Sequence, residues 1–204
     1  MTGPSLRPYQ EAALAAVGAA WRSGRRRVIA HLPTGTGKTI LGLEGARRAL
    51  DRGHRVLWLG HTDELIGQPE RTAKSLGLEP GICKAERDET GPMLTIASVQ
   101  TIGRVERSTR VDAEGEAETV ERTPRLDRAA AAWGRGPGLI VVDEVQHVTS
   151  ATYRRILDRW PDACAIGLTA TVERTDGRSL ASAMPGGIVY QYPISRAIHE
   201  GYLV

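Results

Sequence analysis

Short apolar runs alternate along this chain with segments in which apolar residues recur at every third or fourth position. The runs do not alternate apolar with polar residues, which is typical of strands covered on both faces of a parallel sheet. We therefore predict strands at residues 28–30, 56–59, 82–84, 93–98, 139–142, 163–168 and 188–190.

The segments between these runs have helical patterns. Pro8 suits a first helical turn, and apolar residues at helical spacing follow as far as Trp21, before Gly24 ends the helix. Pro69 is expected to kink or split one of the later helices. Those later helices are predicted at residues 40–52, 62–76, 126–133 and 150–159, with a turn or short helix at 194–204. Alternating strands and helices predict an α/β fold with a mostly parallel central sheet.

Residues 104–124 depart from this pattern. They hold many Glu and Arg residues and few large apolar ones, so they contribute little to a core. We predict an exposed, mobile insertion or an irregular hairpin. A nucleic-acid contact is the alternative, but the acidic side chains of Glu114, Glu116 and Glu118 argue against it.

Composition limits the function without assigning it. The 204 residues are 41% hydrophobic and 25% charged, which suits one α/β domain with a substantial core. The net charge of +3 is compatible with a nucleic-acid partner but does not require one. Residues 25–27 are all arginine and form either a phosphate patch or a solvated strand edge. Two distant cysteines, no long apolar run and no signal segment lead us to expect a cytoplasmic protein without a membrane span.

The candidate chemistry begins in residues 32–39, Leu-Pro-Thr-Gly-Thr-Gly-Lys-Thr, between a strand and a helix. A glycine-rich turn before a helix directs several backbone N–H groups and the helix dipole at one anion. Lys38 is predicted to reach the β- and γ-phosphates of ATP, and Thr39 to bind Mg²⁺. Leu32 stands where the regular phosphate-loop pattern has glycine. The alternative is a turn that carries a lysine by chance.

Two further signals complete a nucleotide site. Asp143 and Glu144 follow a buried strand, where Asp143 is predicted to coordinate Mg²⁺ and Glu144 to polarise the attacking water. Gln10 has an amide that suits the N6/N7 edge of adenine. The predicted nucleotide-binding residues are Gln10, Pro33, Thr34, Gly35, Thr36, Gly37, Lys38 and Thr39.

Taken in order, these motifs resemble the first RecA-like domain of superfamily 2 helicases, in the DExH-type group with type III restriction translocase subunits and DNA-repair helicases. The resemblance implies a three-layer phosphate-loop NTPase fold over residues 1–204. It implies that Gln10 reads the base and that three residues couple hydrolysis to movement: Thr169, Ala170 and Thr171. It also implies nucleic-acid contacts from His61, Thr62, Ser98, Gln100 and Thr101. Strand-end capping is the alternative role for the two threonines of the coupling motif.

Two positions depart from the family pattern. Gln146 stands where this group usually has His or Asp in its acidic motif, and His147 follows one place late. We assign Gln146 to the catalytic set and expect it to bond the γ-phosphate or Thr169–Thr171, with altered coupling. Val172 replaces a proline that is common in an extended form of the coupling motif.

The resemblance implies an ATP-dependent helicase or translocase that acts on DNA rather than RNA. Its second RecA-like domain, with the arginine finger, is not in this chain and is expected in a longer protein or in a partner. We therefore expect weak ATP hydrolysis at most from residues 1–204. The alternatives are a non-catalytic nucleotide-binding or nucleic-acid-binding module and one half of a split helicase.

Overall fold

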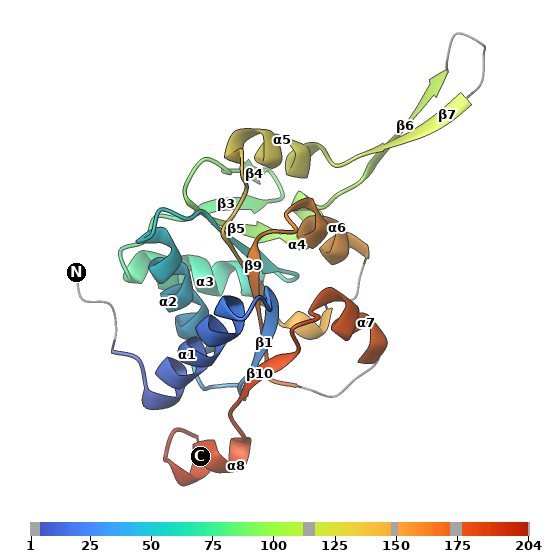
Figure 1. Ribbon diagram of the computed structural model, residues 1–204. Coiled ribbons are helices and arrows are strands. Elements are labelled where there is room, and N and C mark those ends of the chain that lie inside the picture. The colour runs from blue at the N-terminus through green and yellow to red at the C-terminus, as the bar shows by residue number, and fades with distance from the viewer. Residues whose placement is uncertain (1–4, 112–116, 148–150, 172–176, 204) are drawn as a thin grey trace.

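The computed structural model describes residues 5–111, 117–147, 151–171 and 177–203. Eight strands form one sheet in the order β10-β1-β9-β8-β2-β5-β3-β4, in which every pair is parallel except β3 with β4 (Figure 1). The strands are β1 (Arg27–His31), β2 (Val56–Gly60), β3 (Gly81–Lys84), β4 (Arg87–Asp88), β5 (Leu94–Ser98), β6 (Glu106–Val111), β7 (Ala117–Arg122), β8 (Leu139–Asp143), β9 (Cys164–Thr169) and β10 (Ile188–Gln191).

Helices cover both faces of this sheet, as the sequence pattern predicts (Figure 1). They are α1 (Pro8–Arg22), α2 (Lys38–Leu50), α3 (Glu64–Ser75), α4 (Val99–Ile102), α5 (Pro124–Trp133), α6 (Ala151–Arg159), α7 (Gly177–Ala183) and α8 (Ile194–His199), with a 3₁₀ turn at Val145–His147. One core joins α1, α2 and α3 to the sheet, and a second core joins α4, α5 and α6 to its other face. Successive residues of each central strand point into different cores, so the fully apolar strands are buried on both sides.

The predicted strands are all present, with bounds that differ by a few residues. Helix α2 begins at Lys38 rather than at residue 40, because Gly37 already takes the N-cap position. Pro69 lies inside α3 without ending it. A proline at this position cannot donate to Leu65 O, and that carbonyl faces Gly60, where a Cβ would lie only 2.7 Å from it. The sequence reading missed β4 and α7, and the predicted cap Ser150 lies outside the described residues.

Residues 104–124 contain the hairpin β6–β7, which projects away from the body of the domain (Figure 1). The two strands pair in an unbroken antiparallel register from Glu106 with Arg122 to Val111 with Ala117. The pairing is therefore regular, contrary to the expected irregular hairpin, and mobility of the segment stays a prediction.

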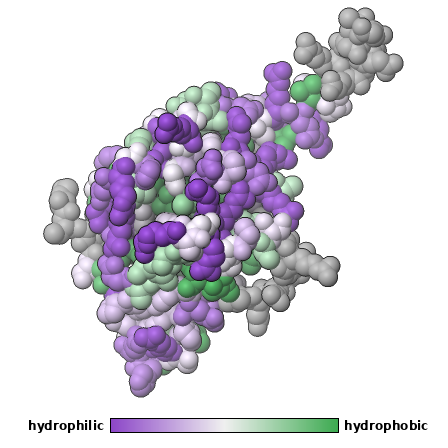
Figure 2. All heavy atoms as spheres, in the orientation of Figure 1, coloured by the Kyte–Doolittle hydropathy of each residue, from purple (hydrophilic) through white to green (hydrophobic). Residues whose placement is uncertain are grey.

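The surface in the same view is mostly hydrophilic, with apolar residues reaching it only in small areas (Figure 2). Among the described residues, no helix is both long enough and apolar enough to cross a membrane.

Two glycines of α2 give a test of how this helix packs. A Cβ at Gly42 would lie 2.7 Å from the Trp58 ring and 2.9 Å from Leu168, whereas one at Gly45 would meet only Leu14, at 3.5 Å. We expect Gly42→Ala to lower the free energy of unfolding by about 1–3 kcal/mol through overpacking. Gly45→Ala should raise it by up to about 1 kcal/mol, because alanine is the better helix former. Urea unfolding measures both, and equal effects would contradict the packing described here.

Candidate functional site

The loop between β1 and α2 is held in one conformation by glycine geometry. Gly35 and Gly37 have φ angles of 82° and 77°, in the left-handed region that favours glycine. Within the turn, the Thr36 hydroxyl donates to the Pro33 carbonyl at 2.6 Å. The first N–H groups of α2, beginning at Lys38, have no acceptor within the helix. The loop therefore presents free donors and the positive end of a helix dipole, as an anion site requires.

Leu32 has a structural role that explains why glycine is absent there. Its side chain is fully buried in the core beneath α1 and α2, and its N–H donates to the Thr169 carbonyl at 2.9 Å. The residue thus continues the pairing between β1 and β9 before the loop turns away.

Lys38, Asp143 and Glu144 form one electrostatic cluster. Burial lowers the pKa of Lys38, and the charges of Glu144 and Asp143 oppose that shift. Burial, followed by the charge of Glu144, raises the pKa of Asp143 to about 6, while Lys38 acts to lower it. Glu144 adopts a left-handed φ of 53°, and its N–H donates to Asp143 Oδ1 at 3.1 Å. A non-glycine residue held in this strained region is often found at functional sites.

The acid at the end of β8 fits a bound cation. Asp143 is 4% exposed, so its carboxylate is buried beside a second carboxylate and has one backbone N–H as its recorded hydrogen-bond donor. Such an undercompensated charge suits Mg²⁺, which proteins hold through one or two carboxylates together with phosphate oxygens. The Thr39 hydroxyl makes no hydrogen bond within the described part of the chain and is the second predicted ligand. No cluster of three or more His, Cys, Asp or Glu side chains suited to a metal occurs among the described residues.

Gln10 contacts the loop rather than open space. Its Nε2 donates to the carbonyls of Thr36 at 3.1 Å and Gly37 at 3.3 Å, and its Oε1 accepts from Arg7 N at 2.9 Å. Adenine recognition by Gln10 stays a prediction, and it requires the amide to exchange at least one of these partners. The sequence reading gave no role to Tyr9, whose hydroxyl donates to the Thr36 carbonyl at 2.7 Å. In the sequence, the only sign of this contact was an aromatic residue directly before Gln10.

Gln146 links the acidic pair to the end of β9. Its Nε2 donates to Glu144 Oε2 at 2.5 Å, and its Oε1 lies 2.8 Å from the Thr169 hydroxyl. The hydroxyl is also 2.7 Å from the Thr171 carbonyl and accepts from Thr171 N. The expected bond between Gln146 and the coupling motif is thus present. Val172 and the rest of the extended motif to residue 176 lie outside the described residues.

His31, which the sequence reading missed, ties the phosphate loop to the same motif. Its Nε2 lies 3.1 Å from the Ala170 carbonyl. His31 and Thr169 are also paired residues of the neighbouring strands β1 and β9. A histidine at the end of the strand before the loop was the only sequence signal for this contact.

The five predicted nucleic-acid residues gather at the ends of β2 and β5, on the same sheet edge as the phosphate loop. Gln100 Nε2 donates to the His61 carbonyl at 2.8 Å, and Ser98 Oγ donates to Gln100 Oε1 at 2.9 Å. Thr62 Oγ1 accepts from Leu65 N in the first turn of α3, while Thr101 Oγ1 accepts from Ala85 N. The side chains therefore support two loop ends side by side, and nucleic-acid contact by them stays a prediction.

The arginines at 25–27 lie at the opposite end of β1. Arg26 donates to the Asp162 carbonyl at 2.8 Å, and Arg27 bonds both Asp158 and the Leu157 carbonyl. Two of these arginines therefore hold the end of α6 and the following turn. This geometry favours a structural role over a phosphate patch.

Comparison with known proteins places the chain in a family. A family model described as "Type III restriction enzyme, res subunit" matches residues 3–174. The chain belongs to this family. It is a ResIII domain, the motor domain of superfamily 2 helicases and translocases.

Two relatives illustrate the relationship. IRC3 of Saccharomyces cerevisiae is 28% identical over 222 residues, which cover 99% of this chain and 28% of IRC3. XPB of Danio rerio, the helicase/translocase subunit of general transcription and DNA repair factor IIH, is 29% identical over 177 residues. That match covers 85% of this chain and 21% of XPB. The chain thus spans less than a third of the length of either relative.

Solved structures agree on the fold. The helicase domain of Hef from Pyrococcus furiosus superposes with a TM-score of 0.65 at 21% identity, covering 91% of this chain and 38% of that one. A nuclease-deletion mutant of the Type ISP restriction-modification enzyme LlaGI, in complex with a DNA substrate mimic, gives 0.68 at 15% identity, covering 97% and 21%. The predicted three-layer RecA-like α/β fold is confirmed.

The raised pKa of Asp143 predicts a pH-dependent stability. The folded ResIII domain holds this proton more tightly than the unfolded chain does. The ionised carboxyl therefore destabilises the fold as the pH rises from about 4 through about 6. In metal-free buffer, Asp143→Asn should raise the Tm by several degrees at about pH 8 and have little effect at about pH 4. Asp162→Asn, on an exposed residue, is the control. A gain of Tm that is equal at both pH values would contradict the assignment.

Proposed function

We propose that this ResIII domain is the ATP-binding motor domain of an ATP-dependent DNA helicase or translocase. The observation that supports this most directly is the cluster of Lys38, Asp143 and Glu144 at the mouth of a glycine-rich loop. A cation, a metal-binding acid and a second acid are the groups that phosphoryl transfer to water needs.

Each side chain has a role that follows from its position. The loop N–H groups and Lys38 bind and orient the phosphates, and Glu144 accepts a proton from the attacking water. Thr39 and Asp143 would hold Mg²⁺, which neutralises charge on the phosphate oxygens. Gln146 orients the Glu144 carboxylate through their 2.5 Å hydrogen bond. The same amide contacts Thr169, so a change in the position of Glu144 is transmitted to the end of β9.

A non-catalytic binding module is the second candidate. It would need the phosphate loop and Lys38, but it would not need Glu144 held in a left-handed conformation and bonded to Gln146. We therefore favour the catalytic reading.

We propose DNA as the nucleic acid along which the protein moves. LlaGI was solved with a DNA substrate mimic, and XPB is named for a DNA repair factor. In this chain, the ends of β2 and β5 bring polar side chains and the backbone around His61 and Gln100 to the edge beside the nucleotide loop. Contacts there with one strand of DNA would place the DNA next to the nucleotide loop and the acidic pair.

Two substitutions separate catalysis from nucleotide binding. Lys38→Ala removes a charge from the phosphate site and should weaken ATP·Mg²⁺ binding by roughly tenfold or more. Glu144→Gln should retain ATP binding, measured by calorimetry, but abolish phosphate release, measured in a longer protein or complex that contains the second RecA-like domain. Glu64→Gln on the exposed start of α3 is the matched control. Unchanged turnover in Glu144→Gln would remove Glu144 from the mechanism, whereas ATP binding with no phosphate release from the unsubstituted protein, even with the second RecA-like domain present, would support the binding module.

The domain by itself should be a poor ATPase. We propose that a second RecA-like domain, in a longer protein or in a partner, supplies an arginine finger, which is worth about 10³–10⁵ in rate in such enzymes. Phosphate release by residues 1–204 should therefore be slow and should change little when single-stranded DNA is added. Robust DNA-stimulated hydrolysis by this chain alone would show that the site is complete without the second domain.

A further inference from the structure

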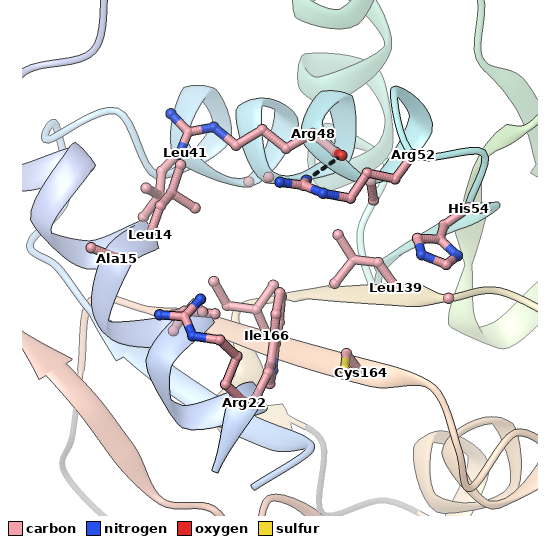
Figure 3. Close-up of a pocket in the computed structure, with 17 residues that line it drawn as sticks. Leu14, Ala15, Arg22, Leu41, Arg48, Arg52, His54, Leu139, Cys164 and Ile166 are labelled. Carbon is pink, nitrogen blue, oxygen red and sulfur yellow. Dashed lines mark hydrogen bonds between the residues drawn. The ribbon is translucent and has the colours of Figure 1, made fainter. Parts of the chain in front are cut away.

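A cavity of about 440 Å³ opens between α1 and α2 and extends from Leu41, in the first turn of α2, to His54, beyond its end (Figure 3). Leu139 and Cys164, the first residues of β8 and β9, lie at its base. The nucleotide residues follow the other ends of these strands, so the cavity is at the opposite edge of the sheet. Its volume is in the usual range for small-molecule sites.

Glycines on the two helices leave this space open. A Cβ at Gly45 of α2 would meet only Leu14 at 3.5 Å, and one at Gly18 of α1 would meet only the mobile end of Arg22 at 3.3 Å. Neither glycine is required by close packing, and both destabilise their helices relative to alanine. Close packing therefore does not explain why Gly18 and Gly45 are glycines, and a larger side chain at either position would occupy the cavity instead.

The charged lining of the cavity is entirely basic. Arg22, Arg48, Arg52 and His54 line it, and its lining residues include no Asp or Glu. Arg48 is paired with Glu11 and Glu44, but neither Arg22 nor Arg52 has a carboxylate partner among the described residues. The Arg52 guanidinium donates to the Arg48 carbonyl at 2.6 Å. Figure 3 shows Arg22, the last residue of α1, and Arg52, in the turn after α2, on opposite sides of the cavity.

The rest of the lining is apolar and adds one more donor. Leu14, Leu41, Leu139 and Ile166 supply the apolar surface. The indole Nε1 of Trp21, which also lines the cavity, is buried and has no acceptor in the part of the chain that the structure describes. The guanidinium groups of Arg22 and Arg52 have no carboxylate partner among the described residues and lie beside an apolar floor whose lining includes no Asp or Glu.

We propose that this cavity binds a small organic anion with an apolar body, such as an aryl or short-chain carboxylate or sulfonate. The apolar body occupies the space beside Leu139 and Ile166, and the positive charges of Arg22 and Arg52 at the cavity attract the anionic group. A charged guanidinium–anion bond is about twice as strong as a neutral hydrogen bond, so the anion provides much of the selectivity. The proposal does not rest on ATP hydrolysis by the opposite edge.

A matched pair of probes tests the charge requirement. Anilinonaphthalene sulfonate has an aromatic body and an anion, and phenylnaphthylamine has nearly the same body without the anion. The sulfonate should bind residues 1–204 at one site, and the double variant Arg22→Gln/Arg52→Gln should weaken it by roughly tenfold. The neutral probe should change by less than about twofold. Arg71→Gln, an exposed arginine of α3, is the charge control.

A cavity-filling variant tests the location. Gly45→Leu should abolish binding of both probes while the Tm is unchanged or higher, because leucine is a good helix former and projects into open space. Bound sulfonate should also slow alkylation of Cys164, which lines the cavity, whereas the buried Cys83 serves as an internal control. The proposal is overturned if the sulfonate does not bind, if Gly45→Leu binds it normally, or if the double arginine variant leaves its affinity unchanged.

Discussion

Parallel pairing of the central strands is the constraint on which the rest of this molecule depends. Because β1, β9, β8, β2 and β5 all run in one direction, their carboxyl ends meet at one sheet edge. Each end carries polar residues that are distant in the sequence, among them Lys38, Asp143 and Thr169. Strands buried on both faces hold these ends rigidly, so the side chains need no further support to stay near one another.

Hydrogen bonds then connect the side chains that the strand ends bring close together. Glu144 bonds Gln146, Gln146 contacts Thr169, and Thr169 contacts Thr171. Tyr9 and Gln10 bond the phosphate loop from the other side, through the Thr36 carbonyl. The nucleotide loop, the acidic pair and β9 are therefore linked through a few hydrogen-bonded polar groups. Such networks couple the positions of their members when every partner is satisfied.

The opposite edge of the sheet has a different character. There, Arg26 and Arg27 brace the chain around α6 and β9, whereas Arg22 and Arg52 flank a cavity without acidic partners. The contrast shows that basic residues at this edge do not share one purpose. Arg26 and Arg27, with carbonyl or carboxylate partners from α6 and the following turn, are structural, and Arg22 and Arg52, which have no carboxylate partner among the described residues, are suited to a ligand.

The sequence by itself determined the fold class and most strands and predicted the phosphate-loop and acidic-pair residues, because these depend on local patterns. A run such as 56–59 is apolar throughout, and Gly35 and Gly37 mark a turn that other residues do not readily adopt. Tertiary structure decided the partners of Gln10, the contact of His31 with Ala170, and the cavity between α1 and α2. These features arise where segments far apart in the chain meet. Their distances depend on how helices and strands pack, and no short stretch of sequence records that geometry.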